Sequence, residues 1–357
     1  MLLNIQVLRA TAAMLVVLVH LQTLGSPLGL EPLVFDLFAV GVDLFFVISG
    51  FIMVHTTSRR PVSPGRFIVD RLVRIAPLYW GLTVAVFVVA LAVPHLLGTT
   101  RADWGALARS LAFIPAERGD GTMRPILFVG WSLNLEMAFY VIFALALMIR
   151  ERNRRIGGTI GLLLVVVAFG ALMRDSLSPE VRFLTQPMLL EFAAGMAIGW
   201  LYPRLPASKG AAILAACLAP LALVMLVWMA RWPLPGGWPG SLPAAVAAVI
   251  CALVAERGGL AIAWRPAQSI GDASYALYLT HPFVTQAWTQ AALHAGFLSP
   301  TTAPWLLAGA MACAVIVALG THAWIEQPLG RAARRFMGTV QGTRFRTGKA
   351  TQVGSQV

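Results

Sequence analysis

The sequence predicts an all-α, polytopic membrane protein with about ten transmembrane helices. Of its 357 residues, 58% are hydrophobic and only 12% are charged, whereas about a quarter of the residues are charged in a typical soluble chain. The apolar residues form continuous runs and lack the alternation of a membrane β-barrel. Because backbone groups within lipid must bond inside their own segment, each run is expected to be helical. This composition excludes a soluble enzyme and a disordered protein.

The predicted spans cover most of the chain. A window of about 19 residues selects residues 4–23, 34–55, 73–95, 126–148, 157–174, 186–202, 210–230, 241–256, 272–293 and 304–326. Several are short for a bilayer that takes about 20 residues. The first run has no small-residue cleavage site, so we expect a retained span and not a signal peptide.

The net charge of +12 has an explanation other than nucleic-acid binding. The basic residues lie between apolar runs, and most of the 27 fall on one side when alternate loops are counted. The positive-inside rule therefore places both termini in the cytoplasm. We expect a transmembrane domain over residues 1–330 and a basic, disordered cytoplasmic tail over 331–357.

Two further features of the chain lead to simple expectations. In the long outer stretch 96–125, Trp104, Leu107 and Leu111 recur at helical spacing, which indicates an interfacial helix. The three cysteines lie inside apolar runs and are expected to be packing residues without disulfides.

The first span contains two ionisable residues, Arg9 and His20. An ionisable group at mid-bilayer costs about 2.5–3.5 kcal/mol on insertion scales, so each is a functional candidate. In an unbroken helix, Arg9 and His20 would point the same way and lie about 16 Å apart. The alternative is an arginine at the inner interface and a hydrogen-bonded core histidine.

The second span reads GVDLFFVISGFIM and contains Asp43 and Ser49. Asp43 lies too deep to be unpaired, and Arg9 is the candidate partner. An ion pair that joins the first two spans is at least as well supported as a catalytic aspartate. The small residues Gly41, Ser49 and Gly50 allow close helix packing.

The third span follows the segment SPGRFIVDRLVR. Ser63 and Pro64 are expected to begin this helix, and Asp70 to pair with Arg74. Arg71 and Arg74 lie one turn apart, and two guanidinium groups can bind phosphate oxygens. The alternative is ordinary loop charge on the cytoplasmic side.

The fourth span reads WSLNLEMAFY, with Glu136 near its middle and Ser132 on the same helix face. Asn134 lies nearby. A buried glutamate suits an acid, a base or a group that orients a histidine. The alternative is an ion pair with an arginine or histidine across the bundle.

The ninth span places Tyr275, Tyr278 and His281 along one polar edge, which can line a cavity or form a packed aromatic face. No two histidines have metal-ligand spacing on one helix, so we predict no metal.

Taken together, these segments resemble the membrane-bound acyltransferase-3 family. The match is in order and spacing, and it covers nearly the whole chain. It comprises Arg9-x10-His20, GVDLFFVISGF (41–51), RLVR (71–74), WSLNLEMAFY (131–140), EFAAGMAIGW (191–200), SYALYLTH (274–281) and IEQPLGR (325–331). The N-terminal segment is most similar to the branch that acylates bacterial exopolysaccharides.

The resemblance implies a multi-pass O-acyltransferase of the bacterial inner membrane. Such an enzyme takes an acyl group, usually acetyl, from cytoplasmic acyl-CoA. It transfers the group to a hydroxyl of a surface or exported polysaccharide, or of its lipid-linked precursor. Acyl-CoA is then a donor substrate, with no tightly bound cofactor. Some relatives carry a further periplasmic domain, and since this chain ends soon after the tenth span, we expect direct delivery.

The resemblance also implies roles for particular residues. His20 acts as a general base or as a transient acyl carrier, and the sequence does not choose between them. Glu136 orients the imidazole, and Arg9 holds the thioester or its oxyanion. Arg71 and Arg74 bind the phosphates of CoA.

A different class of function also fits the composition. A transporter or flippase for a glycolipid or small molecule could equally have ten spans with buried Arg, Asp, Glu and His. Dependence on acyl-CoA separates the two hypotheses. A purely structural subunit of an export complex is less favoured, because each buried charge has an insertion cost. We expect membrane lipid and no nucleic acid as partners, and a homo-oligomer is left open.

Overall fold

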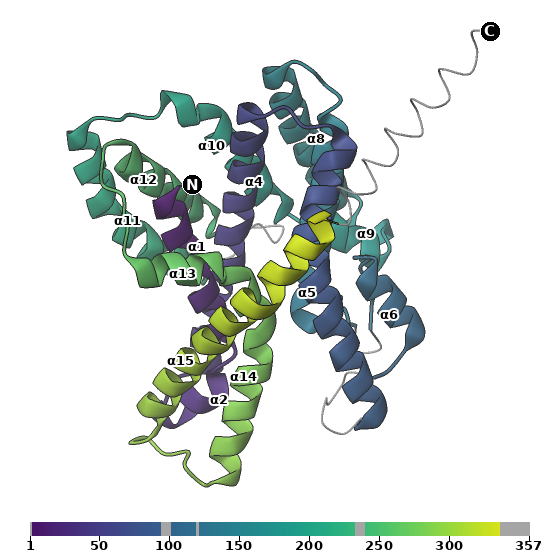
Figure 1. Cartoon of the computed structure of the whole chain (residues 1–357), viewed down its shortest axis with the longest axis vertical. Helices are drawn as coiled ribbons and strands as arrows, with labels where there is room; N and C mark the ends of the chain where they lie inside the picture. The colour runs from purple at the N-terminus through teal and green to yellow at the C-terminus, as the bar shows by residue number, and fades with distance from the viewer. Residues whose placement is uncertain (1, 94–100, 119–120, 233–239, 336–357) are drawn as a thin grey trace.

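The chain folds as a bundle of helices (Figure 1). The computed structural model describes residues 2–93, 101–118, 121–232 and 240–335. The described residues form helices and connecting turns and include no β-strand. The predicted all-α fold is therefore confirmed.

Each of the ten predicted apolar segments contains a long helix. In chain order these are α1 (Leu3–Val19), α4 (Gly41–Arg59), α5 (Pro64–Ala92), α7 (Trp131–Ala146), α8 (Arg152–Leu172), α10 (Leu189–Leu201), α11 (Lys209–Met229), α12 (Leu242–Arg257), α14 (Ser274–His294) and α15 (Ala303–Thr321). Within the described ranges, six helical stretches are long and apolar enough to cross a membrane, and a bent pair brings the number to seven. The chain is therefore a multi-pass membrane protein, and the count of ten spans stays a prediction.

The first predicted span is broken near its end. α1 stops at Val19, and the next helical piece, Gln22–Leu28, is inclined to it by 73°. His20 lies at the break and caps the C-terminal end of α1. The prediction of one span over 4–23 is therefore wrong at its C-terminal end, because the backbone turns away at His20.

The outer stretch contains the expected short helix, α6 (Trp104–Leu111). The Asp103 side chain accepts a hydrogen bond from the Ala106 amide and caps its N-terminus. The Trp104 ring packs edge-on against Phe87 of α5, and Trp80 donates to the Leu111 carbonyl at 2.8 Å. α6 is thus attached to α5, while residues 94–100 lie outside the described ranges.

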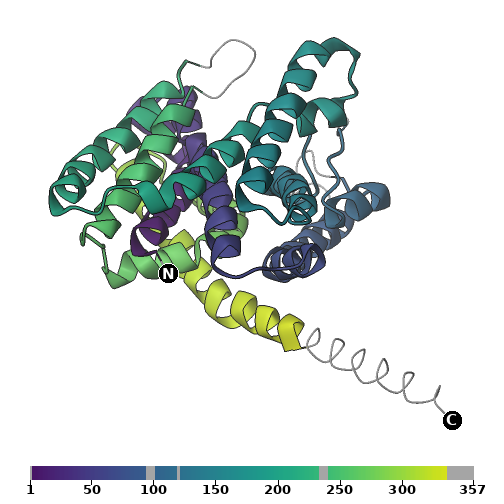
Figure 2. The same cartoon turned by 90° about the horizontal axis from the view of Figure 1, so that it is seen from above.

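The remaining short helices connect the long ones. They are α2 (Gln22–Gly25), α3 (Pro32–Asp36), α9 (Pro179–Leu184) and α13 (Arg265–Asp272). After α15, the chain makes a π-helical turn over His322–Glu326, which packs against α5, and continues as a helix to Arg335. Figure 2 shows this yellow helix projecting from the bundle. The first five residues of the predicted disordered tail are therefore helical, and the rest lie outside the described residues.

Closely packed glycines join α4 to α10. A Cβ atom on Gly50 would overlap the backbone carbonyl of Phe192, and one on Gly195 would overlap that of Val47. The two helix backbones can approach this closely only because both positions lack a side chain. The expectation that Gly50 lets helices approach is confirmed.

The substitution Gly195→Ala is expected to destabilise the protein by about 1–3 kcal/mol, because overpacking forces the two backbones apart. The measurement is thermal unfolding of the purified protein in detergent. Gly161→Ala in α8 is the matched control, since a Cβ there meets no atom within 4 Å. Equal melting temperatures for the two variants would contradict the close contact.

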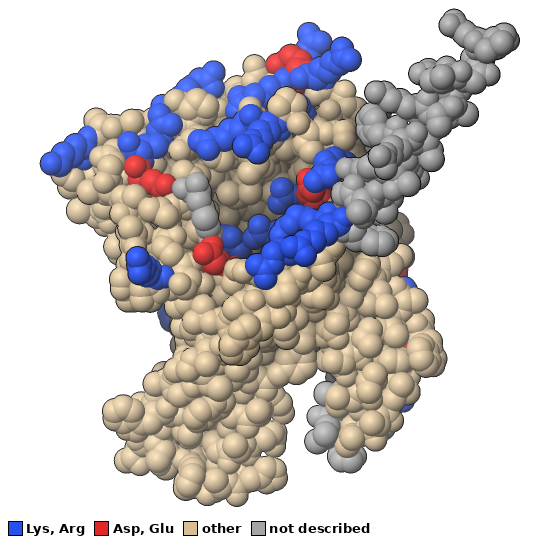
Figure 3. Space-filling view, in the orientation of Figure 1, with Lys and Arg blue, Asp and Glu red and all other residues tan. Residues whose placement is uncertain are grey.

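Basic side chains gather toward one end of the molecule. In Figure 3, blue side chains surround a hollow in the upper half, and the lower half of this face is almost entirely uncharged. This separation is typical of a membrane protein whose charged loops lie on one side. All three cysteines are free, as expected.

Candidate active site

A cavity of about 490 Å³, called here the main cavity, lies between α1, α4, α5, α7 and α14. Most of the predicted site residues line it: Arg9, Ser49, Arg71, Arg74, Ser132, Glu136, Tyr275 and Tyr278. Apolar side chains such as Phe45, Phe46 and Ile52 form much of the remaining wall. Five helices that are distant in sequence thus place the predicted residues around one space.

A second cavity of about 520 Å³, called here the polar cavity, adjoins the first. Both cavities are lined by Gln6, Arg9, Arg71 and Arg74. The other walls of the polar cavity are formed by Asp70, Val73, Asp272, His322, Glu326, Gln327, Gly330 and Arg334. The shared arginines therefore stand between an apolar space and a charged one.

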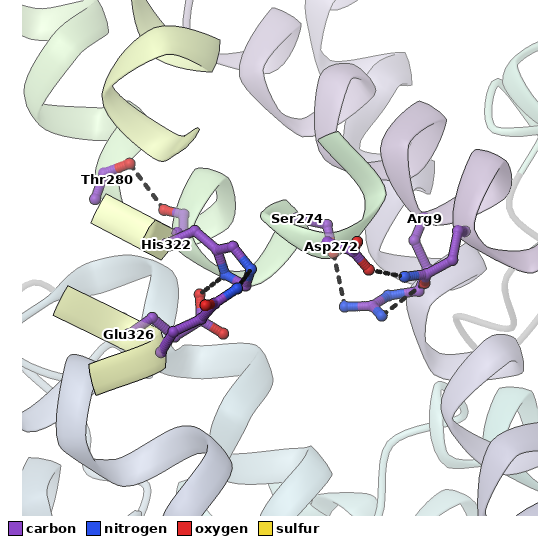
Figure 4. Close-up of polar contacts among 9 residues, drawn as sticks. Arg9, Asp272, Ser274, Thr280, His322 and Glu326 are labelled. Atoms are coloured by element: carbon purple, nitrogen blue, oxygen red, sulfur yellow. Dashed lines mark hydrogen bonds and ion pairs between the residues drawn. The ribbon is translucent and has the colours of Figure 1, made fainter. Parts of the chain in front are cut away.

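Arg9 is held in place by polar neighbours on two elements (Figure 4). Its guanidinium donates to Gln6 Oε1 at 2.9 Å and to Ser274 Oγ at 2.8 Å. Gln6 in turn donates through Nε2 to the Asp272 carboxylate. Both partners are neutral, and no carboxylate among the described residues is in direct contact with the Arg9 guanidinium. Its charge is therefore available to an anionic or polarised ligand group.

Asp43 does not pair with Arg9. It accepts a hydrogen bond from the Ser241 hydroxyl beside the start of α12, and it does not line the main cavity. The predicted Arg9–Asp43 pair is wrong, because each side chain finds a hydroxyl partner on a helix that follows much later in the chain. Asp43 therefore ties α4 to α12.

On the opposite side of the polar cavity, His322 Nδ1 lies 2.8 Å from Glu326 Oε2, one turn further along (Figure 4). Gln327 Nε2 lies 3.0 Å from the other ring nitrogen. These contacts form within the π-helical turn, a feature often found at functional sites.

The helix α5 begins as predicted and presents two arginines to both cavities. Ser63 accepts a hydrogen bond from the Arg66 amide, and Pro64 occupies the first turn. Asp70 pairs with Arg66 at 3.0 Å and not with Arg74. The predicted Asp70–Arg74 pair is wrong, because the carboxylate turns toward the preceding turn of the helix, and Arg74 has no ion pair with a described residue.

Arg71 is oriented by aromatic rings. Its guanidinium carbon lies 5.3 Å from the centre of the Phe67 ring and 5.9 Å from that of Tyr140. Such cation–π contacts hold the charge without using its hydrogen-bond donors, and Nε of Arg71 is buried with no partner among the described residues. Arg71 therefore lines both cavities without a hydrogen bond to any described residue.

Glu136 lies in a small hydrogen-bonded cluster on the cavity wall. It accepts from Ser49 Oγ at 3.1 Å and from the Tyr140 hydroxyl. One helical turn earlier, Ser132 lies 2.6 Å from the Tyr278 hydroxyl, which donates to the Val129 carbonyl at 2.8 Å. Ser132 and Glu136 share a helix face, as predicted.

Two further predicted cavity residues differ in their position relative to the main cavity. Asn134 is buried on a different face of α7 from Glu136, and neither of its side-chain polar atoms has a hydrogen-bond partner in the described part of the chain. It does not line the main cavity. Tyr275 does line it, and its hydroxyl donates to the Ile75 carbonyl at 2.7 Å.

His20 and His281 contact each other. Nδ1 of His20 lies 3.2 Å from Nε2 of His281, and the ring centres are 4.8 Å apart. Neither histidine lines the main cavity. Tyr278 does, and its ring centre lies 6.1 Å from that of His281. Tyr278 therefore both lines the main cavity and neighbours the histidine pair.

The structure does not bring Glu136 into hydrogen-bond contact with His20. The carboxylate is occupied by Ser49 and Tyr140, while the neighbours of His20 are His281 and the Val16 carbonyl. The residue that can orient His20 is therefore a second imidazole and not Glu136. Both catalytic roles stay predictions.

Sequence reasoning missed the groups that support these side chains. Gln6, Asp272, Ser274 and Tyr140 hold Arg9 and Glu136 in position. Gln6 could have been found, because it is a polar residue three positions before Arg9 within an apolar run and so lies on the same helix face.

Comparison with known proteins gives one family and two relatives. A family model described as an acyltransferase domain matches residues 2–322. The exopolysaccharide production protein ExoZ of Rhizobium meliloti (strain 1021) is 37% identical over 306 residues, which cover 84% of this chain and 92% of ExoZ. The putative membrane-bound transacylase BcsY of Komagataeibacter xylinus is 27% identical over 349 residues, covering 91% of this chain and 82% of BcsY. No solved structure matches.

Proposed function

This chain belongs to the membrane-bound acyltransferase-3 family, and we propose that it transfers an acyl group from acyl-CoA to a hydroxyl of an exported polysaccharide. The acceptor class is supported by the name of its relative ExoZ, an exopolysaccharide production protein, and the reaction by that of BcsY, a putative transacylase. We further propose acetyl as the acyl group, the bacterial inner membrane as the location, and ten spans with both termini in the cytoplasm.

The observation that supports this function best is the pair of cavities with a shared wall of arginines. Guanidinium groups bind phosphate oxygens through paired hydrogen bonds. Arg71 and Arg74 face both cavities, so the phosphates of CoA can lie between them while the rest of the nucleotide occupies the polar cavity. The pantetheine arm then extends along the apolar wall of the main cavity.

The wall of the main cavity also offers groups that suit a thioester. Ser132 and Tyr278 provide hydroxyls there, and Glu136 is fixed nearby by Ser49 and Tyr140. Tyr278 also neighbours the two histidines. If the N-terminus is cytoplasmic, His20 at the end of α1 lies further toward the outer side than Arg9. This order matches a donor that enters from the cytoplasm and an acceptor that approaches from outside.

In the reaction, the acceptor oxygen bonds to the thioester carbonyl carbon, and the carbon–sulfur bond breaks. The hydroxyl proton passes to His20 and then to the departing CoA thiolate. In the alternative relay, His20 first takes the acyl group with loss of the thiolate and then yields it to the hydroxyl oxygen. Both routes need His20 and the same donor geometry.

The test is acyl transfer by the purified protein in liposomes. Radiolabelled acetyl-CoA and exopolysaccharide from a deletion strain are supplied, and we expect base-labile label in the polysaccharide. Arg154→Ala, which removes a strongly exposed basic side chain, is the matched control and should retain transfer. A protein that binds no acyl-CoA, together with unchanged polysaccharide acylation in the deletion strain, would contradict the proposal and favour a carrier.

A further inference from the structure

The contact between His20 and His281 has a definite pattern of donors and acceptors. Each ring places its Nδ1 atom against a carbonyl one helical turn earlier: that of His20 lies 3.1 Å from Val16 O, and that of His281 lies 3.1 Å from Leu277 O. The third contact joins Nε2 of His281 to Nδ1 of His20 at 3.2 Å. His281 is completely buried.

The two carbonyls determine where the protons are. A carbonyl oxygen is only an acceptor, so each Nδ1 must carry a hydrogen. A neutral His281 with a hydrogen on Nδ1 has a lone pair on Nε2. That lone pair faces Nδ1–H of His20, which is shared between Val16 O and His281.

Other tautomers of the two histidines would place two hydrogen-bond acceptors against each other or would bury a charge. If His20 carried its proton on Nε2, its Nδ1 lone pair would face the Val16 oxygen at 3.1 Å. It would then need a hydrogen from His281 Nε2, and a neutral His281 would have a bare Nδ1 against Leu277 O. A charged His281 would satisfy Leu277 but would be a cation inside a fully buried site.

The remaining nitrogen of His20 is free. Its Nε2 has no hydrogen bond to a described residue, and His20 is only partly buried. The Phe128 ring, 5.3 Å away between centres, packs against the imidazole. Nδ1 of His20 is therefore held protonated by its two acceptors, and Nε2 carries the lone pair.

We infer that His20 reacts through Nε2, and that His281 is the positioning residue that fixes this tautomer; the inference rests on the proposed acyl transfer. As a base, Nε2 accepts the hydroxyl proton while the oxygen attacks the thioester carbon and the thiolate leaves. The imidazolium so formed keeps its Nδ1–H bonds to Val16 O and His281, and then returns the Nε2 proton to the thiolate. A neutral His281 is required, because only a lone pair accepts Nδ1–H.

Two substitutions separate positioning from packing. His281→Gln provides an amide oxygen that can accept Nδ1–H of His20, whereas His281→Leu provides none. We expect His281→Leu to lower kcat for acetyl transfer by about 100-fold with KM for acetyl-CoA unchanged, and His281→Gln to restore most of the loss. The control is His294→Leu at the exposed end of α14, which should change neither kcat nor KM. An equal kcat for the Leu and Gln variants, or a change in KM alone, would overturn the inference.

A second measurement does not depend on turnover. Histidine labelled with ¹⁵N is incorporated, the protein is placed in lipid nanodiscs, and the His20 signals are identified by their loss in His20→Gln. We expect protonated Nδ1 and bare Nε2 in the wild type, and a mixture of tautomers in His281→Leu. A proton on Nε2 in the wild type would overturn the inference even if transfer is normal. The inferred tautomer in a protein that transfers no acyl group would instead refute the proposed function, and with it the catalytic role of Nε2.

Discussion

Replacing His20 by alanine is expected to lower kcat for acyl transfer by about 10²–10⁴-fold, the range that a positioned proton-transfer group contributes. Nε2 of His20 has no hydrogen bond to a described residue, and His20 does not line the main cavity. The substitution should therefore leave KM for acyl-CoA almost unchanged, because no cavity-lining group is removed. The measurement is steady-state transfer in liposomes at matched protein amounts.

The same variant distinguishes the two routes that the geometry allows. If His20 is an acyl carrier, wild-type protein incubated with labelled acetyl-CoA but without acceptor should retain label, and His20→Ala should not. If His20 is only a base, neither protein retains label. His294→Ala is the control, since that side chain is exposed at the end of α14. Full transfer by His20→Ala at normal expression would eliminate both roles.

Hydropathy predicted the helices well because the bilayer imposes one simple rule on each segment. All ten apolar runs contain helices, and the amphipathic segment around Trp104 forms α6. The bend at His20 could not be predicted in this way. The residues on either side of it, Val19 and Leu21, are apolar and continue the hydrophobic run, so the turn depends on what α2 packs against.

Helical spacing predicted which residues share a helix face, but it did not reliably predict side-chain partners, as the absent Asp70–Arg74 pair shows. Helical spacing correctly placed Ser132 beside Glu136, because residues four apart share a face. Charge complementarity suggested the Arg9–Asp43 pair, which does not form. Partners such as Ser241 and Ser274 lie far along the chain from the residues they contact. These contacts depend on how the helices pack, which no local sequence pattern indicates.

The polar contacts also show why the few buried charges can be accommodated. Arg9 and Asp43 each find neutral hydrogen-bond donors or acceptors in place of an opposite charge. A neutral partner fulfils the hydrogen-bonding requirement of the charged side chain but does not neutralise its charge. For Arg9, which faces both cavities, this arrangement favours a ligand that brings a negative or developing negative charge.

Replacing Arg71 and Arg74 together by alanine is expected to raise KM for acetyl-CoA by about 10²-fold or more, since a hydrogen bond to a charged group contributes about 1.5–3 kcal/mol. Arg74→Ala alone should change only KM, because Arg74 has no ion pair with a described residue. Arg71→Ala should also lower kcat, because the Arg71 guanidinium lies over Tyr140, which hydrogen-bonds Glu136.

Acetyl-pantetheine provides the sharpest control for this second effect, because it has the thioester arm of the donor but none of its phosphates. We expect the wild type and Arg74→Ala to have the same KM for acetyl-pantetheine, while they differ for acetyl-CoA. The difference should shrink as salt rises, since screening weakens contacts between exposed charges. If Arg74→Ala raises KM equally for acetyl-CoA and acetyl-pantetheine, Arg74 shapes the cavity and does not bind the phosphates of CoA. If neither KM changes, Arg71 and Arg74 are charges that only orient α5 in the membrane, and the donor must bind elsewhere.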